Sequence, residues 1–144
     1  MPDNYEVFDV SLNDIKFNLN PVYTQELISK LDSEPLLARS LEGNEFMPGC
    51  VGLNNLKLTD FANCVIQLLS RAKPLRDHCL LSDVKLENLP SSQAQTDSRM
   101  LVSIRFSELI KKLWNPKNFK GHVSPHEFLE AVSIASNKKF KCDD

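Results

Sequence analysis

Long apolar runs are missing from this sequence. No stretch approaches the roughly 18 to 20 consecutive apolar residues that a membrane-spanning helix needs. The first four residues, Met-Pro-Asp-Asn, have neither the basic nor the apolar region of a signal peptide. We therefore expect an intracellular, soluble protein with no membrane partner.

Charge of one sign and closely spaced cysteines are also scarce. The formal net charge is −2, and the lysines and arginines are scattered rather than gathered in one basic tract, so direct nucleic-acid binding has no support. No two of the four cysteines lie closer than 14 positions apart, which excludes a Cys-x-x-Cys zinc or redox pair. We expect reduced thiols, although two disulfides stay formally open; the cysteines are Cys50, Cys64, Cys79 and Cys142.

What the chain does have is the composition of one folded domain. It contains 144 residues, of which 42% are hydrophobic and 25% charged, far from the profile of a disordered chain. No repeat of fixed period is present, which argues against a solenoid. The apolar residues recur mostly at helical spacing, so we predict a mainly α-helical fold.

The first part of the chain predicts short elements. Residues 5–10 alternate polar and apolar types, as in a short strand or an extended arm. Residues 11–17 and 24–31 suit short helices, and the proline after Glu34 predicts another helix over residues 35–41. Residues 43–55 are expected to form an irregular connector.

Four further helices are predicted downstream. Residues 59–70 form the most hydrophobic of them, with an apolar stripe of Phe61, Val65, Leu68 and Leu69 and with Ala62 and Ile66 beside it. Residues 74–81 form a short helix that begins with a proline, and residues 82–98 have loop composition.

The last two helices have clear boundaries. Residues 101–113 carry a broad apolar band that ends before Asn115-Pro116, since proline disfavours helix in the preceding residue. Ser124, Pro125 and Glu127 then supply a cap, a first-turn proline and a capping glutamate for a helix with Phe128, Leu129, Val132, Ile134 and Ala135 on its apolar face.

Residues 52–67 carry a motif. They read Gly-Leu-Asn-Asn-Leu-Lys-Leu-Thr-Asp-Phe-Ala-Asn-Cys-Val-Ile-Gln. This segment resembles the cysteine box of ubiquitin-specific proteases, Gly-Leu-x-Asn-x-Gly-x-Thr-Cys-Tyr-x-Asn-x-x-x-Gln. The positions that match are Gly52, Leu53, Asn55, Thr59, Asn63 and Gln67, with Phe61 at the aromatic position.

The resemblance places the catalytic cysteine of such proteases on Asp60. An aspartate suits the start of a helix as a thiolate does, but its oxygen is a far weaker nucleophile at a peptide carbonyl. Lys57 stands where the box has glycine, which puts a side chain into a loop built for close backbone approach. Asn55 matches the oxyanion-hole asparagine, and without a nucleophile we expect it to hold the loop by hydrogen bonds.

Further strings resemble one branch of this family, the inactive ubiquitin-protease-like splicing factors of the spliceosomal tri-snRNP. They lie at residues 2–6, 48–49, 51–55, 74–76, 113–116 and 122–127. In that branch an aspartate at the nucleophile position is usual. The resemblance implies the helical thumb of a papain-like ubiquitin-specific protease fold, tri-snRNP proteins as partners, weak ubiquitin binding as an open question, and a nuclear location.

The resemblance also sets the expected domain bounds. Residues 1–10 correspond to the end of an upstream zinc-finger-like region or to an extended arm, and residues 11–144 to a partial protease-like domain. The region in which active members carry their histidine lies outside this sequence. No cofactor or metal is implied.

Other candidate nucleophiles are weaker. Cys64 lies one helical turn beyond Asp60, but it matches a small-residue position and should face the core. Cys50 has no histidine after it in a recognisable cysteine-protease order.

The other candidate sites also favour structural roles. His126 and Glu130 half-resemble a His-Glu-x-x-His zinc motif whose second histidine is absent. His78 and His122 are isolated. An aromatic patch of Trp114, Phe119 and Phe128 is more typical of core packing, and Lys111, Lys112, Lys138 and Lys139 are typical of charges near helix C-termini, with a phosphate contact as the alternative.

We therefore expect a non-catalytic interaction module that acts in pre-mRNA splicing. The alternative from the enzyme class is a fragment of an active cysteine-type deubiquitinase. A third possibility is a partial domain whose uncovered apolar face causes self-association.

Overall fold

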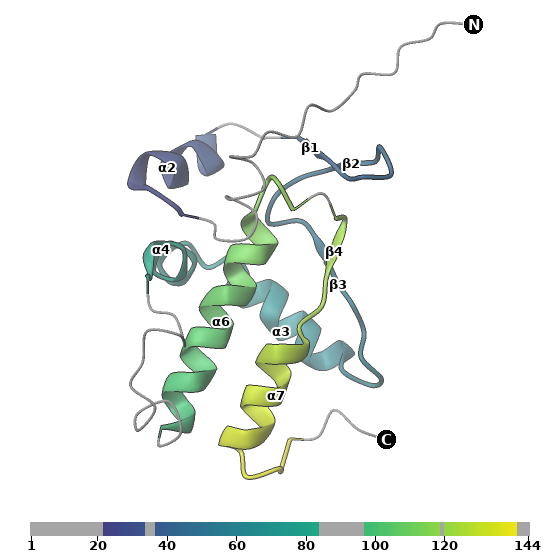
Figure 1. The fold of residues 1–144 in the computed structure, drawn as a ribbon, viewed down its shortest axis with the longest axis vertical. Helices are drawn as coiled ribbons and strands as arrows, with labels where there is room; N and C mark the ends of the chain where they lie inside the picture. Colours follow the sequence, from purple (N-terminus) through teal and green to yellow (C-terminus); the bar gives the residue numbers. More distant parts are fainter. Residues whose placement is uncertain (1–21, 34–36, 84–96, 119, 141–144) are drawn as a thin grey trace, which may run out of the picture.

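The computed structural model describes residues 22–33, 37–83, 97–118 and 120–140 (Figure 1). The expected arm at residues 5–10 and the expected helix at residues 11–17 lie outside this part. Its helices are α2 (Gln25–Ser33), α3 (Asp60–Ser70), α4 (Lys73–Leu81), α6 (Ser98–Trp114) and α7 (His126–Ala135). Its strands are β1 (Ala38–Arg39), β2 (Glu45–Phe46), β3 (Gly52–Leu53) and β4 (His122–Val123). The predicted, mainly helical fold is confirmed, and none of the described helices is long and apolar enough to cross a membrane.

Helix α6 lies at the centre of the fold, between α4 and α7 (Figure 1). The carboxylate of Asp97 caps it by accepting a hydrogen bond of 3.0 Å from the backbone nitrogen of Arg99. The helix ends at Trp114, as the following Asn115-Pro116 predicts. Its apolar band supplies much of the core, and its buried residues are Ile104, Phe106, Ser107, Leu109, Ile110, Leu113 and Trp114.

Helix α7 packs along α6 but does not use the predicted capping box. Pro125 takes the N-cap position, with no side-chain cap. The Glu127 carboxylate turns away to Lys112, 3.0 Å from its ammonium nitrogen, and this hydrogen bond lowers the pKa of Glu127. Of the predicted apolar face, Leu129 is buried whereas Ile134 is 51% exposed. Glu127 therefore forms an ion pair with α6 instead of the helix cap that the sequence predicts.

A buried arginine connects α2, α4 and α6. Arg76 in α4 is 2% exposed and binds both carboxylate oxygens of Asp32 in α2, at 2.8 and 2.9 Å. Its guanidinium also lies 4.6 Å from the ring centroid of Trp114. The hydrogen bond from Arg76, with a smaller one from Lys73, lowers the pKa of Asp32 to about 2. This ion pair orients the two short helices on α6.

Trp114 is buried, as predicted for the aromatic residues of this region. Its indole nitrogen donates a hydrogen bond of 3.1 Å to the carbonyl of Ser70 at the end of α3. Gly49, at a φ of +78°, lies so close to the indole ring that a Cβ there would meet ring atoms at 2.5 Å. Phe128 packs on Phe106 with ring centroids 5.3 Å apart, whereas Phe119 lies outside the described residues.

The predicted helix over residues 35–41 is wrong. Strands β1 and β2 pair antiparallel there, with Ala38 opposite Phe46. Gly43 occupies the connecting turn at a φ of +82°, and Leu41 is 79% exposed instead of core-facing. A helix would have required a buried side for its leucines, whereas the turn allows the backbone to pair with residues 45–46.

The region from residue 43 to 55 is more ordered than the predicted connector. Strand β3 pairs in parallel with β4, from far along the chain, with Gly52 opposite His122. The backbone nitrogen of Asn54 extends this ladder to the carbonyl of Val123 at 3.0 Å. This pairing fixes the start of the cysteine-box-like segment, because Gly52 and Leu53 are its first two residues.

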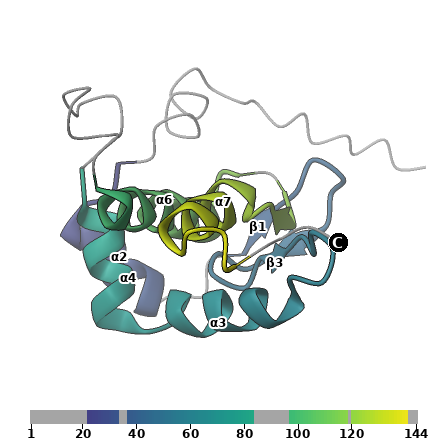
Figure 2. The same ribbon diagram turned by 90° about the horizontal axis from the view of Figure 1, so that it is seen from below.

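Helix α3 begins where the sequence predicts, but most of its apolar stripe faces away from the core. Its buried residues are Ala62, Ile66 and Ser70. The stripe is exposed, at 58% for Phe61, 54% for Val65, 75% for Leu68 and 38% for Leu69. Figure 2 shows why: α6 and α7 lie on one side of α3, and no other described element covers the opposite side.

Candidate functional site

The loop before α3 is held by the side chains of Asn55 and Thr59. The Asn55 Oδ1 atom accepts hydrogen bonds from the backbone nitrogen and the hydroxyl of Thr59, each at 3.1 Å. The Thr59 hydroxyl oxygen in turn accepts a bond of 2.9 Å from the backbone nitrogen of Leu56. Thr59 is 1% exposed, so this small network closes the loop from inside.

Two amide side chains of α3 fasten the helix to the preceding segment. Gln67 donates a hydrogen bond of 2.8 Å to the carbonyl of Val51, and Asn63 donates one of 3.1 Å to the carbonyl of Asn54. Among the described residues, the Asn63 Oδ1 is the buried side-chain polar atom without a hydrogen-bond partner. The four matched polar positions of the box, Asn55, Thr59, Asn63 and Gln67, therefore all join the loop to the helix.

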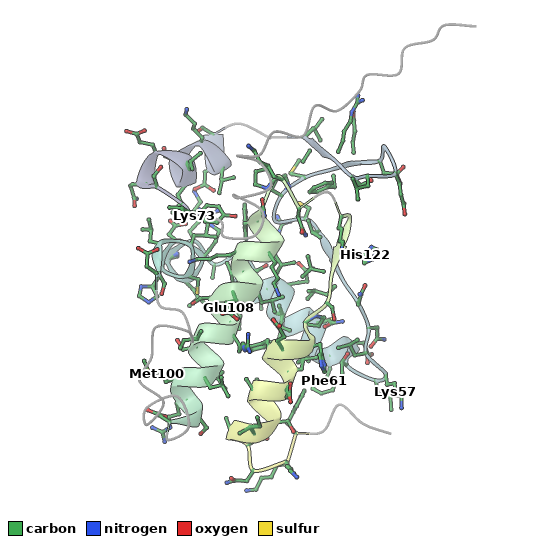
Figure 3. The ribbon with its side chains drawn as sticks, in the orientation of Figure 1. Lys57, Phe61, Lys73, Met100, Glu108 and His122 are labelled. Atoms are coloured by element: carbon green, nitrogen blue, oxygen red, sulfur yellow. The ribbon has the colours of Figure 1, made fainter. Side chains whose placement is uncertain are left out.

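The turn into α3 adopts an unfavourable backbone conformation. Lys57 has a φ of 43° and Leu58 a φ of 37°, both in the left-handed region that glycine tolerates best. The box of the active proteases has glycine at the position of Lys57. This loop thus has a positive φ at Lys57 without the residue type that adopts it at least cost. Figure 3 shows Lys57 and Phe61 near one another at this end of the molecule.

Asp60 is the first residue of α3 and is exposed. Its carboxylate lies in the first turn, where the partial positive charge of the helix N-terminus favours an anion. The same place would activate a thiol, but a carboxylate offers no comparable nucleophile for acyl transfer.

The cysteines of the described residues are free thiols in different surroundings. Cys64 is exposed, so the prediction that it faces the core is wrong. Cys50 is also exposed, and its sulfur accepts a hydrogen bond of 2.6 Å from the guanidinium of Arg71. Cys79 is buried, and this burial raises the pKa of its thiol, which disfavours the nucleophilic thiolate. Cys142 lies outside the described residues.

The histidines do not join the box residues in one site. His78, His122 and His126 are all exposed, and so is Glu130. In residues 22–33, 37–83, 97–118 and 120–140, no group of three or more His, Cys, Asp or Glu side chains could hold a metal ion. Lys111 and Lys112 lie in the last turn of α6, where positive charge complements the helix dipole.

Sequence reasoning missed two supports of the site. Gly49 lies against Trp114, and its backbone nitrogen donates a hydrogen bond of 2.8 Å to the carbonyl of Leu113. Arg71, just after α3, donates to the carbonyl of Gly49 at 3.2 Å. The Pro48-Gly49 pair was a signal for a close backbone approach, but the partner ring lies 65 positions away in the sequence.

Comparison with known proteins places this geometry in a family. The family model described as ubiquitin carboxyl-terminal hydrolase matches residues 51–144. Ubiquitin carboxyl-terminal hydrolase 39 of Homo sapiens is 47% identical over 141 residues, which is 98% of this chain and 24% of that protein. The probable mRNA-splicing protein ubp10 of Schizosaccharomyces pombe is 37% identical and aligns with 100% of this chain and 26% of its own length.

A solved structure agrees with the sequence comparisons. The crystal structure of an essential yeast splicing factor superposes with a TM-score of 0.67 at 28% identity, covering 92% of this chain and 30% of that one. The chain thus spans about a quarter to a third of the length of these relatives. With the box geometry, the family match and the shared fold in agreement, the chain belongs to the ubiquitin carboxyl-terminal hydrolase family and has a ubiquitin-specific protease-like fold.

Proposed function

We propose that the chain is a non-catalytic protease-like module that acts in pre-mRNA splicing, in the nucleus, by supporting assembly of the spliceosomal tri-snRNP. Two proteins similar to this chain carry splicing in their names: the probable mRNA-splicing protein of fission yeast and the essential yeast splicing factor whose crystal structure is known. Because the chain spans only part of their length, the role is proposed here for the protein that carries this segment.

The proposal that the module is non-catalytic rests on the identity of Asp60. The aligned box residues fold into a loop and helix start, and the position of the protease nucleophile holds a carboxylate. An aspartate there preserves the negative charge that the helix N-terminus favours but removes the thiolate chemistry. The site is thus suited to hold shape rather than to cleave an isopeptide bond.

Asn55 is proposed to act as a brace in the same loop. Its side-chain oxygen is engaged by Thr59 through two hydrogen bonds. A brace needs this oxygen, whereas an oxyanion hole needs a donor aimed at a reacting carbonyl. The degenerate site therefore consists of Asp60 and Asn55, with no metal or cofactor assigned to it.

The domain bounds follow the same resemblance. We assign residues 11–144 to part of the protease-like domain and residues 1–10 to the end of an upstream zinc-finger-like region or an arm. The family match begins at residue 51, after the β1–β2 hairpin. Weak binding of ubiquitin by this module is a secondary proposal.

A rescue assay tests the splicing role. Cells that express the protein are depleted of it, and intron retention is measured after re-expression of variants in the full protein. Asp60→Ala should restore splicing as well as the unmodified protein does, because no step uses the carboxylate chemically. Restoration by the unmodified protein but not by Asp60→Ala would contradict the non-catalytic role, and unchanged splicing after depletion would contradict the splicing role.

The competing function is that of a fragment of an active cysteine-type deubiquitinase, which the family match by itself allows. Restoring the nucleophile separates the two. We expect Asp60→Cys to remain without hydrolysis of a ubiquitin fusion, since Lys57 places a side chain in a loop where the box of the active proteases has glycine. Release of ubiquitin by the unmodified chain would support the enzyme instead.

A further inference from the structure

We draw no further inference here: the strongest candidate, the apolar stripe of Phe61, Val65, Leu68 and Leu69 on the outward side of α3, belongs to a chain that spans only part of the length of its relatives, and nothing in the part of the chain that the structure describes shows what covers it.

Discussion

Helices α6 and α3 are both rich in apolar residues, yet their surroundings are opposite. The apolar band of α6 is buried, and Ile110 at its centre is 0% exposed. The apolar stripe of α3 is mostly in solvent, and Leu68 is 75% exposed. Hydrophobic periodicity identifies the side of a helix that avoids water, but it does not say which part of the molecule, or which other molecule, covers that side.

The two helices also differ in what fixes them. Side-chain packing against α4 and α7 holds α6 in place. Hydrogen bonds to the backbone hold the inner side of α3, from Gln67 to Val51 and from Asn63 to Asn54. Asn63 and Gln67, two of the residues that match the cysteine box, make this attachment, and Asp60 is the first residue of the same helix.

The largest expected contrast comes from truncating one side chain in each helix. Ile110→Ala in α6 should lower the free energy of unfolding by about 2 to 5 kcal/mol, because it opens a cavity in a packed core. Leu68→Ala in α3 should change it by less than about 0.5 kcal/mol, because its side chain is already solvated. Urea unfolding followed by circular dichroism measures both, and comparable losses would show that the α3 stripe is covered after all.

The polar attachment of α3 should be the next most sensitive feature. Thr59→Ala removes the hydroxyl that bonds Asn55 and Leu56 in a buried position, and should cost about 1 to 3 kcal/mol in unfolding free energy. Thr59→Ser keeps the hydroxyl and serves as the matched control. Equal losses in the two variants would mean that packing of the methyl group, rather than the hydrogen bonds, holds the loop.

Acid should weaken the attachment of α2 and α4 to α6, because it protonates Asp32, the partner of Arg76. Its pKa is lowered to about 2 by Arg76, so the ion pair stabilises the fold above the unfolded-state pKa of about 3.9 and loses this effect as pH falls toward 2. The effect is moderate because the carboxylate is 29% exposed and screened by water. Urea midpoints of the unmodified chain and Asp32→Asn should therefore converge as pH falls, and a constant difference between them would contradict the assignment.

The smallest expected effect lies in the loop before α3. Lys57→Gly should raise the free energy of unfolding by about 0.5 to 1 kcal/mol, because relief of the left-handed backbone outweighs the entropy that glycine adds to the unfolded chain. Lys120→Gly, at an exposed position without a positive φ, should not stabilise. A loss of stability in Lys57→Gly would show that the lysine side chain supports the loop.

Much of this fold could be predicted because its signals are local. Asn115-Pro116 ends α6, the proline in α4 lies in its first turn, and Thr24 begins α2 by accepting a hydrogen bond of 3.3 Å from the backbone nitrogen of Leu27. The helix expected at residues 35–41 failed because the competing structure depends on the turn at Gly43 and on residues 45–46. Local helix propensity does not include that pairing.

The candidate site, too, could be predicted where its signals are local and could not be where they depend on distant residues. The resemblance located the loop and the start of α3 because the polar positions of the box match one by one. It did not reveal that Cys64 faces solvent, since the direction of α3 depends on β3, β4 and α6 rather than on its own sequence. The contacts of Arg76 and Gly49 with Trp114 could not be predicted for the same reason, because Trp114 is remote from both in the chain.

We propose that this chain carries no catalytic nucleophile, and one measurement tests this proposal most directly. The purified chain is incubated with ubiquitin whose C-terminus bears a thiol-reactive warhead, and its intact mass is then determined, with an active ubiquitin-specific protease as the positive control. We predict that the mass stays that of the unmodified chain, although Cys50 and Cys64 are exposed. A ubiquitin adduct on any cysteine of this chain would contradict the claim.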